Sequence, residues 1–304
     1  MKKLSIIVPC YNEEGNIKLF FETAVKSLKK EKYISEFIFI NDGSKDNTLN
    51  NLIELTKSTE IVKIINFSRN FGKESAIYAG LKKCTGDYAV LIDADMQQHP
   101  KLILPMLREI EKDSDIDIVA YYQEKRKENK FVSLLKTMFY KIINKVSDVE
   151  FKSDASDFRL FNRNVLNTIL SFEEQNRFQK GIFAYIGYNT KYLPYIPESR
   201  HAGKTNWNIK SLIKYAFNGI MSYSNYLITL PTKIGFFELL IAIIWFLVLL
   251  FNKAAIQNYI IVLFITLISM LQISVGLIGD YVYRTYQETK KRPHYIIKGI
   301  ISNE

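Results

Sequence analysis

The stretch YAVLIDADMQ, residues 88–97, joins a short apolar run to two carboxylates that follow it directly. An apolar run of this length that ends in a polar loop is typical of a strand buried inside a sheet. Similar runs occur at residues 4–8, 37–40, 62–67 and 116–120. The helices expected between the strands cover residues 17–28, 48–57, 74–83 and 101–111. This alternation predicts an α/β fold with a mostly parallel sheet, in which ligands bind beyond the carboxyl ends of the strands.

The chain has 304 residues and a net charge of +10, which indicates an anionic partner. A membrane, a phosphorylated substrate and a nucleic acid are all anionic, but the sequence contains no nucleic-acid-binding motif. We therefore expect no nucleic acid partner. The two cysteines, Cys10 and Cys84, match no metal-ligand spacing and indicate a reduced compartment without a disulfide. Charges resume soon after residues 4–10, so we predict no signal peptide and a cytosolic N-terminal domain.

Two long apolar stretches lie near the end of the chain. Residues 234–251 are apolar apart from Glu238, and residues 259–279 carry no charge. Each stretch is long enough for a helix across the hydrocarbon core of a bilayer, which takes ~20 residues. We predict that they form a transmembrane hairpin within residues 231–304, followed by a basic tail. A hairpin buried inside a soluble protein is the alternative.

Cations are distributed unevenly around the two predicted spans. The link between them holds Lys253, whereas the outer ends are flanked by Lys204, Lys210, Lys214, Lys233, Arg284, Lys290, Lys291 and Arg292. The positive-inside rule then places the catalytic domain and both chain ends in the cytoplasm, in a multi-pass protein of the cell membrane. Residues 206–230 have helical spacing of apolar residues with lysines and tyrosines beside them. They predict an amphipathic helix at the membrane interface, with a core-packing helix as the alternative.

Polar side chains follow the predicted strands and are candidate ligands. Asp93 and Asp95 can reach one divalent cation, which prefers oxygen ligands, and Gln97 could add another oxygen. Such a cation would hold a diphosphate and stabilise the charge that develops on it as it leaves. Asp42 could accept a hydrogen bond from a uracil imide, and Tyr11 offers a ring for stacking. Turn and helix-cap chemistry explains each of these loops equally well when it is taken singly.

The motifs VPCYNEE, NDGSKDNT, SRNFGKE, DADMQQHP, SDFRL and RHAGKTNW, in this order, resemble glycosyltransferase family 2. Their order and spacing are similar to its polyprenyl-phosphate branch, which includes bactoprenol glucosyltransferases and dolichol-phosphate mannose synthases. The resemblance covers residues 4–230 and implies a Rossmann-like glycosyltransferase A-type domain within residues 1–205. It also implies a Mg²⁺ or Mn²⁺ cofactor, a nucleotide-sugar donor, a polyprenyl-phosphate acceptor and a homotetramer.

The resemblance also implies roles for single residues. Asp157 matches the proposed base or acceptor-site carboxylate, and Arg200 matches an arginine on a loop that closes over the donor. The nucleotide-sugar site is matched by Pro9, Tyr11, Glu13, Ile40, Asp42, Asp93, Ala94, Arg126 and Lys204. The metal site is matched by Asp93, Asp95 and Gln97. Asn206 stands where the family usually has lysine, and Lys204 is the candidate to supply that cation.

These patterns predict an inverting transfer of a sugar, glucose by default, from a nucleotide sugar, expected to be UDP-linked. The acceptor would be undecaprenyl or another polyprenyl phosphate at the cytoplasmic membrane face. Because that acceptor is already an anion, we expect positioning and charge screening to matter more than a base. A transferase of the same fold with another lipid or glycan acceptor is the nearest alternative. A non-catalytic membrane scaffold is the other, and its expected mark, loss of Asp93 or Asp95, is absent from the sequence.

Overall fold

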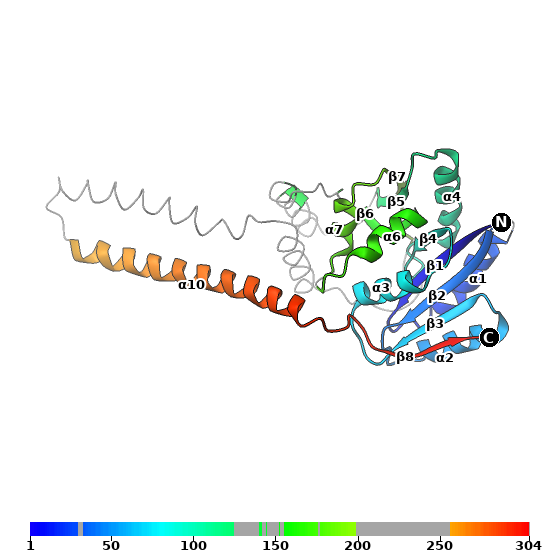
Figure 1. Ribbon diagram of the computed structural model, residues 1–304, viewed down its shortest axis with the longest axis horizontal. Coiled ribbons are helices and arrows are strands. Elements are labelled where there is room, and N and C mark those ends of the chain that lie inside the picture. The colour runs from blue at the N-terminus through cyan, green and yellow to red at the C-terminus, as the bar shows by residue number, and fades with distance from the viewer. Residues whose placement is uncertain are drawn as a thin grey trace.

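The computed structural model describes residues 1–29, 33–124, 140–141, 144, 152, 155–175, 177–198 and 256–303 (Figure 1). Its strands are β1 (Lys2–Cys10), β2 (Tyr33–Asn41), β3 (Val62–Phe67), β4 (Tyr88–Leu91), β5 (Ile118–Gln123), β6 (Ala155–Asn162), β7 (Thr190–Tyr195) and β8 (Ile297–Ser302). Its helices are α1 (Ile17–Leu28), α2 (Thr48–Ser58), α3 (Lys73–Lys83), the short η1 (Pro100–Leu102), α4 (Ile103–Lys112), α6 (Arg163–Ser171), α7 (Gln179–Tyr185) and α10 (Ile256–Thr289). The predicted α/β alternation up to residue 120 is confirmed.

The described strands form one sheet in the order β7-β5-β6-β4-β1-β2-β3-β8. The central strands β4, β1, β2 and β3 are parallel, so their carboxyl ends meet at one edge of the sheet. In contrast, β6 runs antiparallel to β4 and β5, and β8 runs antiparallel to β3. The sheet is therefore mixed. Its parallel centre places the loops after β1 to β4 side by side, as ligand sites in such sheets require.

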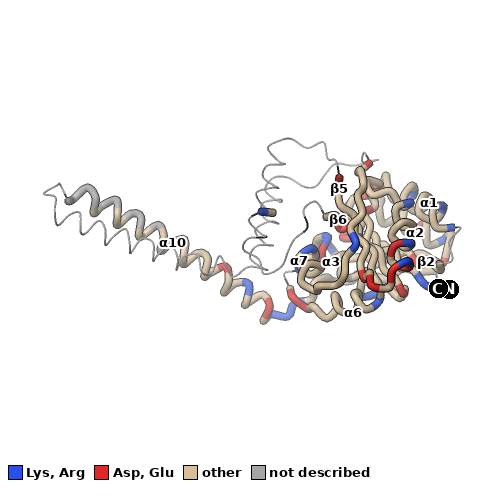
Figure 2. Tube along the Cα trace, turned by 90° about the horizontal axis from the view of Figure 1, so that it is seen from above, with Lys and Arg blue, Asp and Glu red and all other residues tan. Residues whose placement is uncertain are grey.

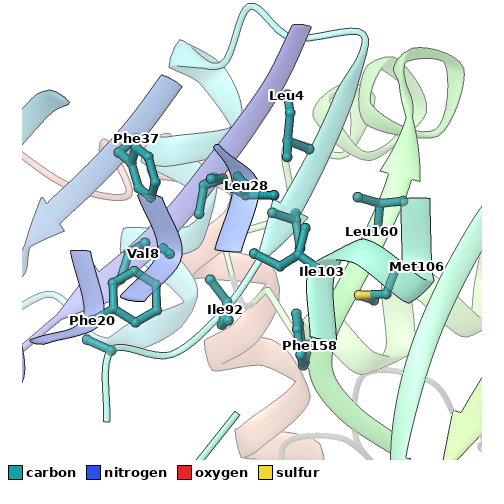
Figure 3. Close-up of a cluster of buried hydrophobic side chains, with 14 of the residues drawn as sticks. Leu4, Val8, Phe20, Leu28, Phe37, Ile92, Ile103, Met106, Phe158 and Leu160 are labelled. Carbon is teal, nitrogen blue, oxygen red and sulfur yellow. The ribbon is translucent and has the colours of Figure 1, made fainter. Parts of the chain in front are cut away.

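Side chains of the strands alternate between two apolar layers, one on each face of the sheet. Ile6 and Val8 of β1 enter the layer covered by α1, α2 and α4, where Figure 3 shows Val8 near Phe20 and Phe37. Ile7 enters the opposite layer, covered by α3, α6 and α7. Both layers pack against the strands that lead into the carboxyl-edge loops, and so fix where those loops begin.

The chain returns to the sheet after α10, which projects away from it (Figure 1). Strand β8 pairs with β3 from Lys63 opposite Ser302 to Phe67 opposite Ile297. Just before β8, the ring of Tyr295 stacks on Phe67 with centroids 4.9 Å apart. The segment predicted as a basic tail thus contains an edge strand of the catalytic domain.

Charged residues of α10 gather near its sheet-proximal end, where Asp280 pairs with Arg284 (Figure 2). Within the described ranges, no helix combines the length and apolar character that a membrane crossing needs. The predicted second span, residues 259–279, lies within α10. The predicted first span (234–251), the interfacial helix (206–230) and the domain boundary at residue 205 lie outside the described residues. The transmembrane hairpin therefore stays a prediction.

Candidate active site

The loops after β1 and β2 are tied together at the carboxyl edge. The backbone N–H of Asn12 donates to Ser44 Oγ at 3.0 Å, and that of Glu13 donates to Thr48 Oγ1 at 2.7 Å. The Glu13 side chain accepts a hydrogen bond from Asn16 at the start of α1. The motifs VPCYNEE and NDGSKDNT therefore form one structural unit.

Asp42 links that unit to the loop after β3. Its side chain is buried, and its two oxygens accept from the backbone N–H groups of Phe71 and Gly72 at 2.6 and 2.9 Å. Burial raises the pKa of this carboxyl above its ordinary value, although the two backbone donors oppose the rise. Asp42 thus anchors the SRNFGKE loop. The nucleobase contact predicted for Asp42 stays a prediction.

The anchored loop places Lys73, the first residue of α3, between two of the predicted site carboxylates. Its Nζ lies 2.7 Å from Asp93 Oδ1, 2.9 Å from Asp93 Oδ2 and 3.1 Å from Asp157 Oδ2. Asp93 follows β4 and Asp157 belongs to β6, so three elements converge on one ammonium group. The structure therefore brings together the donor-side and acceptor-side carboxylates that the sequence predicted separately.

Lys73 was part of a motif but had no predicted role. A lysine in the first turn of a helix opposes the helix dipole by roughly 0.3–1 kcal/mol. Such a residue needs compensation from nearby carboxylates, and this signal could have marked Lys73 in the sequence. Its partners could not be identified that way, because Asp157 is separated from it by 84 residues along the chain.

The two carboxylates that contact Lys73 have opposite pKa shifts. Burial acts to raise the pKa of Asp157, but the charges of Lys73, Lys180 and Arg159 and the hydrogen bond from Lys73 together outweigh it and lower that pKa to about 2. For Asp93 burial dominates, supported by the charges of Asp95 and Asp157, and the pKa is raised despite Lys73. Burial lowers the pKa of Lys73, but both carboxylates more than offset this, so it lies above its ordinary value. Asp157 and Lys73 are therefore an ionised pair at neutral pH.

The loop after β4 has a tightly determined shape. Met96 has a positive φ of 64°, and Asp95 Oδ1 accepts from the backbone N–H of Gln97 at 3.1 Å. Gln98 accepts from the backbone N–H of Asp93 at 3.2 Å and donates to Ser156 Oγ at 3.0 Å. This side chain, which sequence reasoning missed, ties the loop of Asp93 to the strand that carries Asp157.

The donor set of this loop fits a divalent cation held jointly with a substrate. Asp93 and Asp95 come from one loop, and the described parts of the chain contain no cluster of three or more His, Cys, Asp or Glu residues suited to a metal. Mg²⁺ is commonly bound by one or two carboxylates together with substrate phosphates and water. Two carboxylates are thus enough for a metal that arrives with a diphosphate.

A narrow recess, too tight to hold a water molecule, lies between these groups and is lined by Pro9, Lys73, Ile77, Leu91, Ile92, Asp93, Gln98 and Asp157. Pro9, Asp93 and Asp157 are predicted site residues that it brings together. Ile40 and Ala94 are buried, so their side chains pack inside the protein. Tyr11 is half-buried at the same edge. Arg126, Arg200 and Lys204 lie outside the described residues.

Glu74 is a further acid that had no predicted role; it follows Lys73 directly in α3 and is half-buried. Its Oε2 accepts from the backbone N–H of Gln179 at 3.1 Å. Burial raises its pKa to about 8, and the charge of Asp157 adds to the rise, while Lys73 and Arg177 oppose it. At neutral pH this carboxyl group is mostly protonated.

Comparisons with known proteins identify the family and the fold of this chain. Residues 5–170 match the family model described as Glycosyl transferase family 2. The chain is 40% identical to CsbB of Bacillus subtilis (strain 168), a protein named as a glycosyltransferase, over 97% of this chain and 91% of CsbB. It is 35% identical to the prophage bactoprenol glucosyl transferase homolog of Escherichia coli (strain K12), over 98% of this chain and 99% of that protein. In fold it is similar to glucosyl-3-phosphoglycerate synthase from Mycobacterium tuberculosis, whose structure was solved with Mn²⁺, UDP and phosphoglyceric acid. The TM-score is 0.51, and the two chains are 17% identical over 72% of this chain and 76% of that one.

Proposed function

The chain belongs to glycosyltransferase family 2, and from this premise we propose that it transfers a sugar from a nucleotide sugar to a polyprenyl phosphate at a membrane. The observation that carries the proposal is the extent of the match to the bactoprenol glucosyl transferase homolog. That match spans 98% of this chain and so continues past residue 170, where the family model ends, through α10. A shared C-terminal part favours a shared lipid acceptor over a soluble one. Glucose and UDP are the proposed sugar and nucleotide.

Asp93 and Asp95 would hold Mg²⁺ or Mn²⁺ together with the donor diphosphate, and Gln97 is the proposed third contact. The metal would supply stabilisation of the negative charge that forms on the leaving diphosphate. Gln98 and the β4 loop hold Asp93 at a fixed distance from the strand of Asp157. The chain's own contribution is thus a rigid arrangement of two anionic substrates around few cations.

Asp157 is proposed to position the acceptor and not to remove a proton from it. A carboxylate with a pKa of about 2 is a weak base near neutral pH. A phosphate monoester is already largely ionised there, with a second pKa of about 6, and needs no strong base. An inverting displacement by a phosphate oxygen is therefore compatible with this carboxylate.

The exposed surface of α10 supports a lipid environment. Its large exposed apolar side chains are Ile260, Leu263, Phe264, Leu267, Ile268, Leu271, Ile273, Val275, Ile278 and Val282. Leaving one such side chain in water forgoes about 1.5–3 kcal/mol of burial free energy, so a row of them calls for an apolar partner. We place α10 in the membrane, with the sheet and both chain ends on the cytoplasmic side. The homotetramer stays a prediction.

The pairing of β3 with β8 restricts the possible topologies. β7 ends at Tyr195 and β8 begins at Ile297, and both belong to the same sheet. Any membrane crossings between these residues must therefore be even in number. The predicted two-span hairpin satisfies this requirement, whereas a single span does not.

A donor screen tests the proposal. The full chain in membranes that contain undecaprenyl phosphate is given radiolabelled UDP-sugars, and label in the lipid fraction is measured. We expect lipid-linked sugar from one donor, loss of transfer in excess EDTA and recovery with Mn²⁺ or Mg²⁺. Asp95→Asn should abolish the transfer and serves as the matched inactive control. Label on diacylglycerol or a glycan would favour the alternative acceptor, and turnover in excess chelator would reject the metal assignment.

A further inference from the structure

Lys73 directs its ammonium group at the two site carboxylates. An ammonium group has three N–H donors. Lys73 Nζ has three carboxylate oxygens within 3.1 Å, namely both oxygens of Asp93 and Oδ2 of Asp157. Both oxygens of Asp93 are therefore engaged by a cation in this state. A second cation that binds Asp93 therefore competes with Lys73 for the same two oxygens.

The backbone around Lys73 is fixed independently of these contacts. Asp42 accepts from the N–H groups of Phe71 and Gly72, the two residues directly before Lys73. The side chain of Ile77, one helical turn later, lines the same recess. The ammonium group is thus delivered to its position by the fold, and its reach is set by the start of α3.

We propose that Lys73 is a positioning residue that occupies Asp93 until a divalent cation, carried by a nucleoside diphosphate, displaces it from Asp93 and leaves it on Asp157. The inference rests on the proposed function for the identity of the cation site. Displacement frees N–H donors of the ammonium group beside Asp157. Those donors suit an oxygen of the acceptor phosphate, so donor binding prepares the acceptor side of the site.

Charge balance links the cation to the acceptor side of the site. Asp93, Asp95, Asp157 and Lys73 together carry a formal net charge of −2, which a divalent cation would neutralise. The neutralised cluster no longer repels a phosphate anion, whereas the same cluster without the cation does. Without Lys73 the free site would carry −3, which strengthens metal binding but leaves Asp157 uncompensated beside the acceptor.

The test is a Mn²⁺ titration of the full chain in detergent, with UDP present but without sugar donor or lipid, followed by calorimetry. Lys73→Met removes the competing charge at similar length, and we expect it to tighten Mn²⁺ binding on the order of tenfold, within the usual range of coupling between two ligands. Lys73→Arg keeps the charge and should bind Mn²⁺ like wild type. Lys2→Met is the matched control, because Lys2 Nζ pairs with Glu111 Oε1 at 3.1 Å at the opposite end of β1. Thermal unfolding of each variant verifies folding.

A merely structural lysine would not produce tighter metal binding on removal. Unchanged or weaker Mn²⁺ binding in Lys73→Met overturns the proposal, as does the absence of Mn²⁺ binding in every variant. The second readout is transfer to undecaprenyl phosphate, where Lys73→Met should lower kcat/KM for the acceptor at saturating Mn²⁺ while Lys2→Met does not. Because the titration contains no substrate, a wild-type chain that binds Mn²⁺ but transfers no sugar counts against the proposed function alone.

Discussion

Gly43 and Arg69 lie in loops after different strands, yet a Cβ atom on Gly43 would stand 2.4 Å from the carbonyl carbon of Arg69. This close approach lets the backbone of the SRNFGKE loop lie against the loop of Asp42. It also explains why glycine follows the aspartate in the motif. The contact fixes the backbone of the loop that leads to Lys73, so Gly43 affects the position of Lys73 although glycine has no side chain of its own.

Gly43→Ala should be far more damaging than the same change at a glycine without close neighbours. Gly187 is the matched control, because both residues have a φ of +66° and a Cβ on Gly187 meets nothing within 4 Å. Gly187→Ala should lose about 1–2 kcal/mol of unfolding free energy from backbone strain alone. Gly43→Ala adds overpacking against rigid backbone, typically another 1–3 kcal/mol. Urea unfolding of both variants measures the difference, and equal losses would contradict the close approach.

Glu74 should make the folded protein less stable as pH rises. Its folded pKa of about 8 exceeds the ordinary 4.5, so between these values the folded state keeps a proton that the unfolded state has lost. The unfolding free energy should therefore fall from pH 5 to pH 8, by a total on the order of a few kcal/mol, and level off above pH 8. Glu74→Gln should remove this slope, since a glutamine oxygen still accepts from the Gln179 N–H.

The measurement is the unfolding midpoint of wild type, Glu74→Gln and Glu109→Gln at several pH values between 5.5 and 8.5. Glu109 is a suitable control because its hydrogen bond from Lys191 lowers its pKa, so it stays ionised throughout this window. Wild type and Glu109→Gln should show the same slope. A slope that persists in Glu74→Gln would assign the effect to another group.

Tyr295 should contribute to stability through its ring and not through its hydroxyl. The ring stacks on Phe67 with centroids 4.9 Å apart and meets Tyr78 of α3 edge-on at 6.4 Å. Tyr295→Ala should lose about 1–3 kcal/mol, less than a fully buried aromatic, and Tyr295→Phe should lose little. Ile296→Ala is the neighbouring control, because that side chain is 53% exposed. Similar losses for Ile296→Ala and Tyr295→Ala would contradict the stacking account.

The central strands were predictable because each is a local apolar run. Strand β8 was not, since IKGIIS is short and half-exposed and forms through pairing with residues more than 200 positions earlier. Strand β6 was not predicted either, and its antiparallel direction is set by tertiary pairing with β4 and β5 and not by a local apolar run. Local patterns therefore predicted the site-bearing half of the sheet best.

The residues of the candidate site fall into the same two groups, those that the sequence identifies and those that only the structure identifies. Asp93 and Asp95 stand out in sequence because they follow an apolar strand, and Asp157 stands out because it belongs to the SDFRL motif. Lys73 and Gln98 do not, because their importance lies in partners from other elements. Asp42 shows the opposite difficulty: a polar residue after a strand can serve the neighbouring backbone instead of a ligand. Sequence reasoning identifies the chemical groups, and the fold determines which of them meet.

Cysteine labelling tests the membrane topology, and the pairing of β3 with β8 makes its outcome sharper. Asn303 directly follows β8, so it must lie on the side of the sheet, whereas Gln257 lies at the far end of α10. Cation asymmetry predicts that the sheet lies in the cytoplasm. The native Cys10 and Cys84 are buried and give little background. A membrane-impermeant maleimide should therefore label a cysteine at position 257 in intact cells, but one at position 303 only after permeabilisation. Labelling of position 303 in intact cells would reverse the orientation, and protection of both positions until permeabilisation would reject the crossing.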